Sequence, residues 1–497
     1  MNSKEEINIV WFKRDLRFLD HDPLYYAQQY PFPILLIYFF EPSIMNSNDS
    51  DSRHWRFIYE SLMEMNTRLE VNRSKIYIFH NEVQPVFEIL ASLFSIKNVF
   101  SYQETGNQLT YTRDRNMSLF FRKNNIIWNE YQTNGIVRGL KIRNEWHKLW
   151  ETKMTSPVNH FDENKLTLAQ LDFEVFNELK GNELNTDITI RNSDFQQGGE
   201  HWAWRYFKNF VLERHIDYSK NISNPSLSRI SCSRISPYLS YGNISMRMVY
   251  QFTLTHYNNS RNKRSLSNFI SRLHWHCHFI QKFESECRYE NENINRAFDA
   301  LIKHRNENYI RAWQNGKTGV PIVDACLRCV VKTGYLNFRM RALVVSFFTY
   351  NLWQDWRELH FLARQFLDYE PGIHYPQLQM QSGTTGINTI RIYNPIKNSK
   401  SYDSEGSFIK KWIPELQQVP AALIHEPHNL SIIEQKIYNC EIGRDYPFPI
   451  VDVEATGKYA RDVMWKFRKK TEVKSEAQNI LEKHVNNSKK QKTKNEK

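Results

Sequence analysis

Two short segments place hydroxyl groups and cations immediately before a proline that can open a helix. Three serines and Arg234 precede a proline in the stretch 231–242, and Lys317 and Thr318 lie between two glycines ahead of Pro321. Hydroxyls, guanidinium groups and the free N–H groups of a helix start are the usual ligands of phosphate. Both segments are therefore candidate anion sites. N-capping by the serines and a plain helix entry explain the same residues.

Two further cations adjoin a strongly apolar stretch. Arg339 and Arg341 precede the run Ala342–Phe348, which predicts a buried helix. A guanidinium beside such a run needs a partner if it is buried. Asp368 and Glu370 are candidate partners. A solvated helix edge is the alternative.

The cluster His274–His278 and the pair Cys326 and Cys329 raise the question of metal binding. On a helix His274 and His278 share a face, but the intervening cysteine points elsewhere, and no second ligand pair lies nearby in sequence. The two cysteines lie within a helical run, which favours core packing over redox chemistry. We therefore expect no metal site.

Five short apolar runs alternate with helix-like segments through the first 131 residues. Between the runs, apolar residues recur with a helical period, as from Trp55 to Leu69. This alternation predicts a five-stranded, parallel, Rossmann-like α/β fold with ligands beyond the carboxyl ends of the strands. No GxGxxG or P-loop pattern follows any run, so ordinary dinucleotide or nucleoside triphosphate binding is not indicated. The runs are Ile7–Phe12, Ile34–Phe40, Ile76–Phe79, Val99–Tyr102 and Ile126–Tyr131.

The chain divides into four segments by composition. Residues 1–135 form the predicted α/β domain, and the polar stretch 136–197 is typical of an interdomain linker. Residues 198–465 have helical spacing almost throughout and predict a larger all-α domain. Residues 466–497, which end in a lysine-rich run, predict a disordered basic tail.

Length and charge narrow the class of protein further. The chain of 497 residues carries a formal charge of +12, which favours polyanionic partners such as nucleic acid. No run of eighteen apolar residues occurs, so we expect no membrane span. The start Met1–Glu6 lacks an apolar signal core, and the six cysteines form no dense framework. The cysteine usage favours a reducing compartment, either the cytoplasm or a nucleus. We expect a monomer.

Longer motifs point to a family. Four stretches, in order along the chain, resemble signatures of the photolyase/cryptochrome flavoproteins, and the resemblance covers almost the whole chain. It implies an N-terminal antenna domain, a helical domain that holds a U-shaped FAD, room for a second (antenna) chromophore, and blue-light chemistry. The stretches are Trp11–Arg17, Trp313–Ala325, Tyr393–Pro395 and Tyr402–Leu416.

The resemblance also implies roles for single residues. Tyr218 stands where the family has a tyrosine that contacts FAD, and 232–236 stands at its phosphate-contacting loop, with a cysteine in place of the usual threonine. Arg341 and Asp368 resemble the ion pair beside the isoalloxazine, and with Trp356 they form the expected catalytic set. The expected cofactor-binding set is Tyr218, Cys232, Ser233, Arg234, Ile235, Ser236, Arg341, Asp368, Tyr369 and Glu370.

The expected DNA-binding residues depart from the family's pattern. Arg272 replaces a glutamate ahead of the retained Trp275, which would stack flipped bases. A guanidinium only donates hydrogen bonds, so Arg272 cannot accept one from a thymine edge. Phe338 replaces an asparagine and offers a stacking surface instead. Asn337 replaces a histidine, which argues against repair of (6-4) lesions, and Arg339 completes the set as a phosphate ligand.

The family's chain of three electron-carrying tryptophans is broken. Trp356 aligns with its middle member, while Lys303 and Pro376 fall near the other two positions. Candidates for an alternative path are Tyr350, Trp353 and Tyr375.

Two functions follow from these residues. The first is a FAD-dependent deoxyribodipyrimidine photo-lyase, which binds UV-damaged single- or double-stranded DNA and passes an electron from light-excited, reduced flavin to a pyrimidine dimer. The second is a cryptochrome-type blue-light photoreceptor without repair activity. The altered substrate positions favour the receptor, and the broken tryptophan chain opposes it. A flavoprotein that binds nucleic acid without turnover is a third interpretation.

Overall fold

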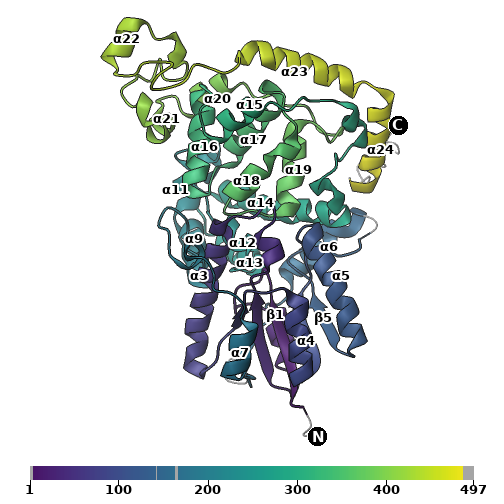
Figure 1. Cartoon of the computed structure of the whole chain (residues 1–497). Coiled ribbons are helices and arrows are strands. Elements are labelled where there is room, and N and C mark those ends of the chain that lie inside the picture. The colour runs from purple at the N-terminus through teal and green to yellow at the C-terminus, as the bar shows by residue number, and fades with distance from the viewer. Residues whose placement is uncertain (1–3, 141–142, 163–165, 485–497) are drawn as a thin grey trace.

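The N-terminal part of the chain forms a parallel sheet with helices on both faces (Figure 1). The computed structural model describes residues 4–140, 143–162 and 166–484. Every strand pair is parallel, and the strand order is β3-β2-β1-β4-β5. The five predicted strands and the α/β class are confirmed. The strands are β1 Glu6–Phe12, β2 Ile34–Phe39, β3 Tyr77–Phe79, β4 Ser95–Tyr102 and β5 Ile127–Tyr131.

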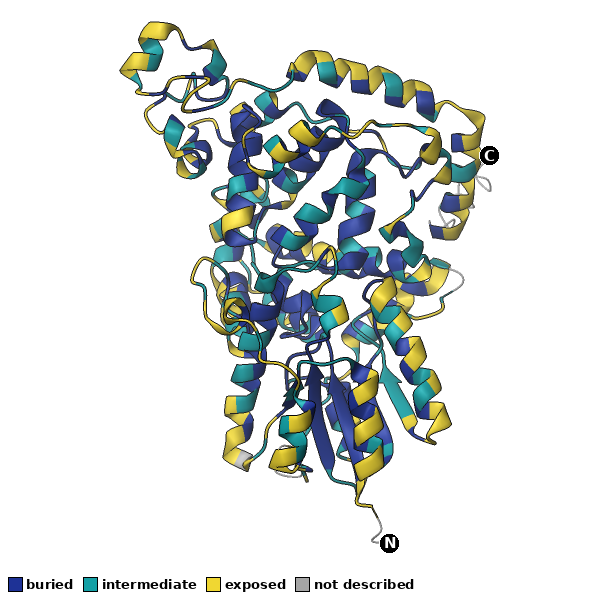
Figure 2. Cartoon of the chain, in the orientation of Figure 1, coloured by how far each residue is buried: buried dark blue, intermediate teal, exposed yellow. Residues whose placement is uncertain are grey.

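The continuous apolar runs explain why these segments pair in parallel at the centre of the domain. All of β2 and all but the first residue of β1 are buried, as expected for strands covered on both faces. The edge strand β5 is only half-buried, and Figure 2 shows it lighter than its neighbours. The covering helices are α1 Asp22–Ala27, α2 Pro42–Met45, α3 Ser52–Leu69, α4 Val83–Leu93 and α5 Gln108–Lys123.

The segment expected to link the domains contains helices of its own. Its α6 packs against a helix of the second domain, and its later part returns to the sheet, where Leu168 pairs with Ile34 and Gly181 with His80. The segment therefore lies along both domains. Its helices are α6 Trp146–Thr155, α7 Phe173–Leu179 and α8 Thr186–Thr189.

The remainder is helical, as predicted, and the helices that matter for the site converge above the sheet (Figure 1). Among the described residues no helix is long and apolar enough to cross a bilayer. The helices are α9 Glu200–Leu212, α10 Tyr218–Asn221, α11 Ser228–Ser231, α12 Ser236–Ser240, α13 Met246–Tyr257, α14 Lys263–Ser285, α15 Glu307–Gln314, α16 Pro321–Thr333, α17 Phe338–Ser346, α18 His360–Gln365, α19 Pro371–Ser382, α20 Pro395–Tyr402, α21 Ser407–Trp412, α22 Ile432–Ile437, α23 Val453–Arg468 and α24 Thr471–His484.

The disordered tail predicted from residue 466 onward is wrong for its first part. The helix α23 continues to Arg468, and α24 follows with Val473, Ile480 and His484 buried. Few apolar residues mark this helix, but they share one face, and α24 packs on the short 3-10 helix Arg296–Ala300. Residues 485–497, which hold the lysine-rich end, lie outside the described residues.

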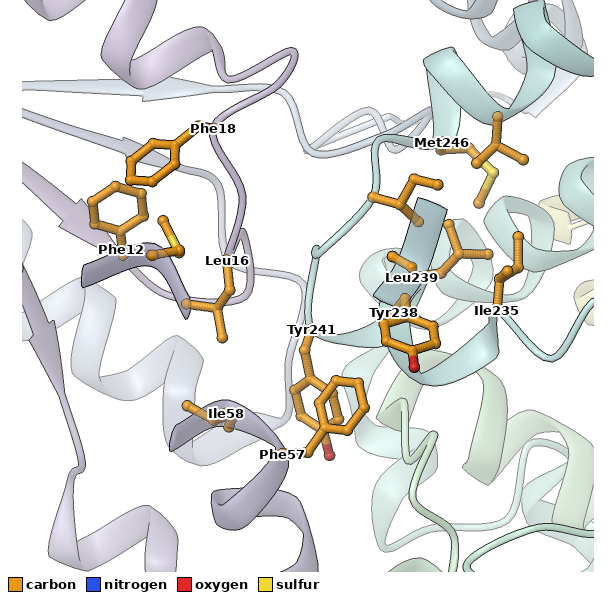
Figure 3. Close-up of a cluster of buried hydrophobic side chains, with 14 of the residues drawn as sticks. Phe12, Leu16, Phe18, Phe57, Ile58, Ile235, Tyr238, Leu239, Tyr241 and Met246 are labelled. Carbon is orange, nitrogen blue, oxygen red and sulfur yellow. The ribbon is translucent and has the colours of Figure 1, made fainter. Parts of the chain in front are cut away.

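One hydrophobic core joins the two domains (Figure 3). Phe12 and Leu16 from the end of β1 belong to the same buried cluster as Tyr238 and Tyr241 from around α12. The ring of Tyr241 lies 5.2 Å from that of Phe57 on α3. The loop after β1 is therefore held directly against the helical domain.

Candidate functional site

A cavity of about 320 Å³ opens in the helical domain between α12, α14, α17 and α19. Most of its walls are apolar, with a small set of charged and polar side chains, which is the usual composition of a ligand site. The structure brings ten of the predicted residues into this cavity. They are Tyr218, Cys232, Ser233, Arg234, Ile235, Ser236, Arg272, Phe338, Arg341 and Asp368.

The ion pair predicted between Arg341 and Asp368 is present in the cavity wall. Nη2 of Arg341 donates to both carboxylate oxygens of Asp368, at 3.0 and 2.9 Å. Nε of Arg341 donates to the carbonyl of Leu336, which fixes the plane of the guanidinium. Burial opposes ionisation of Asp368, but Arg341 outweighs it, and the pKa of the carboxyl is lowered. The site therefore holds a fixed negative charge beside a fixed positive one.

The loop at 232–236 carries a cation that has no carboxylate partner among the described residues. Arg234 has a left-handed backbone with φ of +61°, and its guanidinium lies 3.7 Å from the ring centroid of Tyr335. Nη2 donates to Gln196 at 2.8 Å, whereas Nε is buried without a hydrogen bond. Burial lowers the pKa of Arg234. A buried, incompletely bonded guanidinium at a loop of serines suits an anionic ligand.

Four more residues that line this cavity each hold a buried polar atom without a partner among the described residues. They are His276, Asn337, His374 and Gln377. Buried polar groups are nearly always hydrogen-bonded, so their concentration in one cavity indicates a polar ligand. Burial lowers the pKa of His276 to about 4 and that of His374 to about 3, so both imidazoles are neutral at physiological pH.

The sequence analysis placed Asn337 among the altered substrate positions but missed His276, His374 and Gln377 as site members. On α19 the positions 374, 377, 378 and 381 all line the cavity, a spacing that places them on one helical face. On α14 the positions 272 and 276 do the same. Helical spacing measured from Arg272 was the signal that could have found His276. Asp368 lies before α19 begins, so no such spacing from it indicated His374 or Gln377.

Other predicted residues lie outside this cavity. Glu370 caps α19 and accepts a hydrogen bond of 2.6 Å from Arg14, and Tyr369 donates to Asp49. Both side chains point toward the sheet domain, whereas Asp368 points into the cavity. Trp356 is buried, with its indole N–H donating to Asn293 at 2.8 Å, and it does not line the cavity.

The remaining predicted DNA contacts lie on two other hollows. Trp275 faces a cavity on the opposite side of α14, and Arg339 lines a surface hollow with Tyr393. Near the broken electron chain, the Nζ of Lys303 donates to the carbonyl of Thr349 at 2.6 Å and lies 4.7 Å from the ring centroid of Trp353.

A second, smaller cavity of about 120 Å³ lies at the carboxyl ends of the strands, where the parallel sheet predicts a ligand. Arg113 donates to Glu41 and Glu104 in its wall. Burial raises the pKa of Glu41 to about 7, although Arg113 opposes the shift. Tyr369 and Asp49 also line this cavity, so it adjoins the contact between the domains.

Comparisons with known proteins agree with this arrangement. Residues 8–149 match the family model of DNA photolyase, and residues 269–466 match the FAD binding domain of DNA photolyase. A deoxyribodipyrimidine photo-lyase of Alkalihalophilus pseudofirmus is 27% identical over 91% of this chain and 96% of its own. The chain belongs to the photolyase/cryptochrome family.

Solved structures share the fold. A cryptochrome of Synechocystis has a TM-score of 0.83 at 22% identity and covers 93% of this chain and 100% of its own. An archaeal photolyase of Sulfolobus tokodaii, solved with two FAD molecules, has a TM-score of 0.74 at 23% identity and covers 93% and 99%.

The residues of the larger cavity fit FAD, which is the cofactor of the matched domain. Arg234 and the serine loop suit its phosphates, and the unpartnered atoms of Asn337, His374 and Gln377 suit its heteroatoms. The cavity is called the flavin cavity below.

Proposed function

We propose that this protein is a light-driven DNA repair enzyme, a deoxyribodipyrimidine photo-lyase that receives a flipped pyrimidine dimer at the mouth of the flavin cavity. One observation carries the proposal. Phe338 lines the cavity yet is 45% exposed, and the guanidinium of Arg272 lies 5.9 Å from its ring centroid. An exposed ring beside a cation is the surface on which nucleobases stack.

The chain's own residues would bind and orient the reactants. When bound and reduced, FAD supplies the excited electron that splits a pyrimidine dimer. Arg341 and Asp368 hold fixed opposite charges against the flavin cavity, and the neutral His276 and His374 leave that balance unchanged. Phe338 would stack the flipped base and keep water from the cavity mouth.

A cluster of arginines supports a nucleic-acid partner. Arg339, Arg391 and Arg461 line one surface hollow with Tyr393 and the 42% exposed Trp465, and its described lining residues include no carboxylate. Guanidinium groups and aromatic rings together bind a phosphate backbone and its bases. The formal charge of +12 acts in the same direction.

A cryptochrome-type photoreceptor without repair activity is the second candidate, and Arg272 favours it. A guanidinium has no acceptor atom, so it cannot take the N–H of a thymine edge as a carboxylate can. The fold is shared with a cryptochrome as well as with photolyases, and it supports either function.

The smaller cavity at the strand ends is proposed to hold an antenna chromophore, because its mixture of aromatic rings and ion pairs suits a planar polar ligand. The six cysteines carry free thiols, which suits a reducing compartment such as the cytoplasm or a nucleus.

Repair of a defined lesion tests the enzyme directly. Photoreduced, FAD-loaded protein is illuminated with blue light in the presence of a single-stranded oligonucleotide that carries one cyclobutane thymine dimer. We expect the thymine absorbance to return with multiple turnovers. Binding of the oligonucleotide without any return of absorbance, even at an excess of protein, would overturn the enzyme and leave the photoreceptor.

A further inference from the structure

The helix α14 separates the flavin cavity from a third cavity of about 490 Å³. The two cavities have no lining residue in common. Arg272 and His276 face the flavin cavity, whereas Trp275, Phe279 and Lys282 line the third one. Its other walls come from α6, α19 and the end of α24, which lie together on one side of the molecule (Figure 1).

Lys282 is a buried cation that lacks a hydrogen bond. The residue is 8% exposed, its ammonium makes no hydrogen bond to any described residue, and its Nζ is not among the fully enclosed unpartnered polar atoms. The nearest aromatic face is that of Tyr289, whose centroid lies 5.6 Å from Nζ. Burial, and then Arg143, lowers the pKa of Lys282 to about 8, and Glu286 opposes the shift. An ammonium that is largely removed from water and lacks a carboxylate favours an anionic ligand.

Arg143 is a second cation that forms no ion pair with a carboxylate in the described part of the chain. Its Nη2 donates to the carbonyl of His278 at 2.8 Å and to Nδ1 of the same residue at 2.9 Å, while Nη1 is buried without a partner. Burial lowers the pKa of Arg143 to about 10. The carboxylate of Glu286 accepts from Tyr289 and His484 and forms ion pairs with Arg288 and Lys483. Among the described residues no hydrogen bond or ion pair joins it to Lys282 or Arg143.

Two histidines of this cavity, His274 and His278, are neutral at physiological pH. Because Nη2 of Arg143 can only donate, Nδ1 of His278 accepts, and the proton of the neutral ring lies on Nε2. Burial lowers the pKa of His278 to about 3 and that of His274 to about 4. Nδ1 of His147 and Nε2 of His274 lie 2.9 Å apart and share one hydrogen bond. The cavity thus presents two cations and polar N–H groups, and its described lining residues include no carboxylate.

An exposed aromatic surface lies beside these cations. Trp275 is 44% exposed, and the ring of Phe279 lies 5.7 Å from it at an angle of 31°. A cation pair next to an open indole face matches a ligand that carries both an anion and a planar ring. We infer that the third cavity binds a nucleotide unit, with its phosphate between Arg143 and Lys282 and its base against Trp275.

The nucleotide has two sources, a free mononucleotide or one unit of a DNA strand. The second rests on the proposed function, in which DNA is the partner. The shared chemistry is a phosphate joined to a nucleobase, and titrations with the two forms tell the sources apart.

Calorimetric titration of the full-length, FAD-loaded protein in the dark tests the site, because the flavin cavity is then filled. The probes are thymidine 5′-monophosphate, thymidine and an oligothymidylate. We expect the monophosphate to bind and thymidine to bind far more weakly. Lys282→Met should weaken monophosphate binding by about tenfold or more, since a charge-assisted hydrogen bond is lost. Lys148→Met, which removes an exposed charge from α6 outside the cavity, should leave it unchanged.

The titration with oligothymidylate shows whether the bound nucleotide is free or part of a DNA strand. Weaker oligothymidylate binding by Lys282→Met assigns the site to a DNA strand, and unchanged oligothymidylate binding assigns it to a free nucleotide. Equal monophosphate affinities of the wild type, Lys282→Met and Arg143→Gln would overturn the inference. Repair of a dimer is measured separately, so a failure of the repair function and a failure of this site give different results.

The pH dependence supplies a readout that a structural role would not change. Lys282 loses its proton as pH rises through about 8, so monophosphate affinity should fall there. Arg143 stays charged to about pH 10, and His274, His278 and His484 are neutral throughout this range. Lys282→Arg, whose guanidinium does not lose its proton, should bind equally at pH 7 and pH 9. An unchanged fall in this variant would contradict the role of Lys282.

Discussion

The guanidinium of Arg14 donates a hydrogen bond of 2.6 Å to Oε2 of Glu370, and this contact ties the loop after β1 to the first turn of α19. Nε of Arg14 also donates to the carbonyl of Ser240 at 2.9 Å. Because His374 and Gln377 follow on the same helix and line the flavin cavity, this ion pair is one of the contacts that align the sheet domain with the site.

Loss of Arg14 should destabilise the whole chain. Arg14→Met leaves the carboxylate of Glu370, whose side chain is 6% exposed, without its cation, and we expect the free energy of unfolding to fall by about 3 kcal/mol. In the double variant Arg14→Met/Glu370→Gln neither charge remains, so most of the loss should be recovered. Urea unfolding measures both, with the exposed Arg122→Met as control. Equal losses in the single and double variants would argue against the ion pair.

Neutralising Asp368 should weaken flavin retention and alter acid stability. In the folded chain burial opposes ionisation of Asp368, but Arg341 lowers its pKa below the ordinary value. The stabilisation is therefore complete above the ordinary pKa of aspartate, about 4, and is lost as pH falls through the lower folded value. Urea unfolding of the flavin-free protein should show a deficit for Asp368→Asn at pH 7 that shrinks below about pH 4.

The control for this prediction is Asp462→Asn, which changes an exposed carboxylate on α23. Its unfolding free energy should follow that of the wild type at every pH. A deficit for Asp368→Asn that stays constant down to pH 3 would mean that the stabilisation by the Asp368 carboxylate does not depend on its negative charge.

Phe338 should matter for DNA and not for the flavin. Phe338→Ala removes a half-exposed ring, so stability and FAD content should stay near those of the wild type, while affinity for a dimer-containing oligonucleotide falls by about tenfold. Phe173→Ala removes a 75% exposed ring from α7 and should change neither. Fluorescence anisotropy of a labelled oligonucleotide measures the affinity, and equal values for the two variants would refute the stacking role.

The arginine hollow should control the salt dependence of DNA binding. Arg461→Gln removes one phosphate ligand from α23, so affinity should fall and the slope of log affinity against log salt should decrease by about 1. Titrations of an undamaged duplex at several salt concentrations give the slope. Arg122→Gln, which changes an exposed residue of α5 outside this hollow, should keep the wild-type slope. An identical slope for Arg461→Gln would exclude a phosphate contact there.

Much of the fold was predictable from the sequence, because continuous apolar runs leave few alternatives. The runs at β1 and β2 can be satisfied only by strands buried on both faces. The helix α24 was not predictable in the same way. Its buried residues are few among many charged ones, and they form a helix because a surface elsewhere in the chain receives them.

The charged residues of the flavin cavity were predictable from the sequence. Which of several adjacent residues point into the cavity was less predictable. Asp368, Tyr369 and Glu370 are neighbours, yet only Asp368 enters the cavity, because the chain turns into α19 at this point. Trp275 and His276 are likewise adjacent and face different cavities across α14. Residue type gives the chemistry of such positions, but the backbone direction decides which cavity they line.

The contact between the rings of Phe57 and Tyr241 limits how the two domains can be produced as separate fragments. A cut near residue 197 would leave Tyr238 and Tyr241 on one fragment and Phe12 and Leu16 on the other. These apolar side chains would then be exposed to solvent. Each fragment expressed alone should therefore aggregate, and the two fragments should be soluble only when they are produced in the same cell.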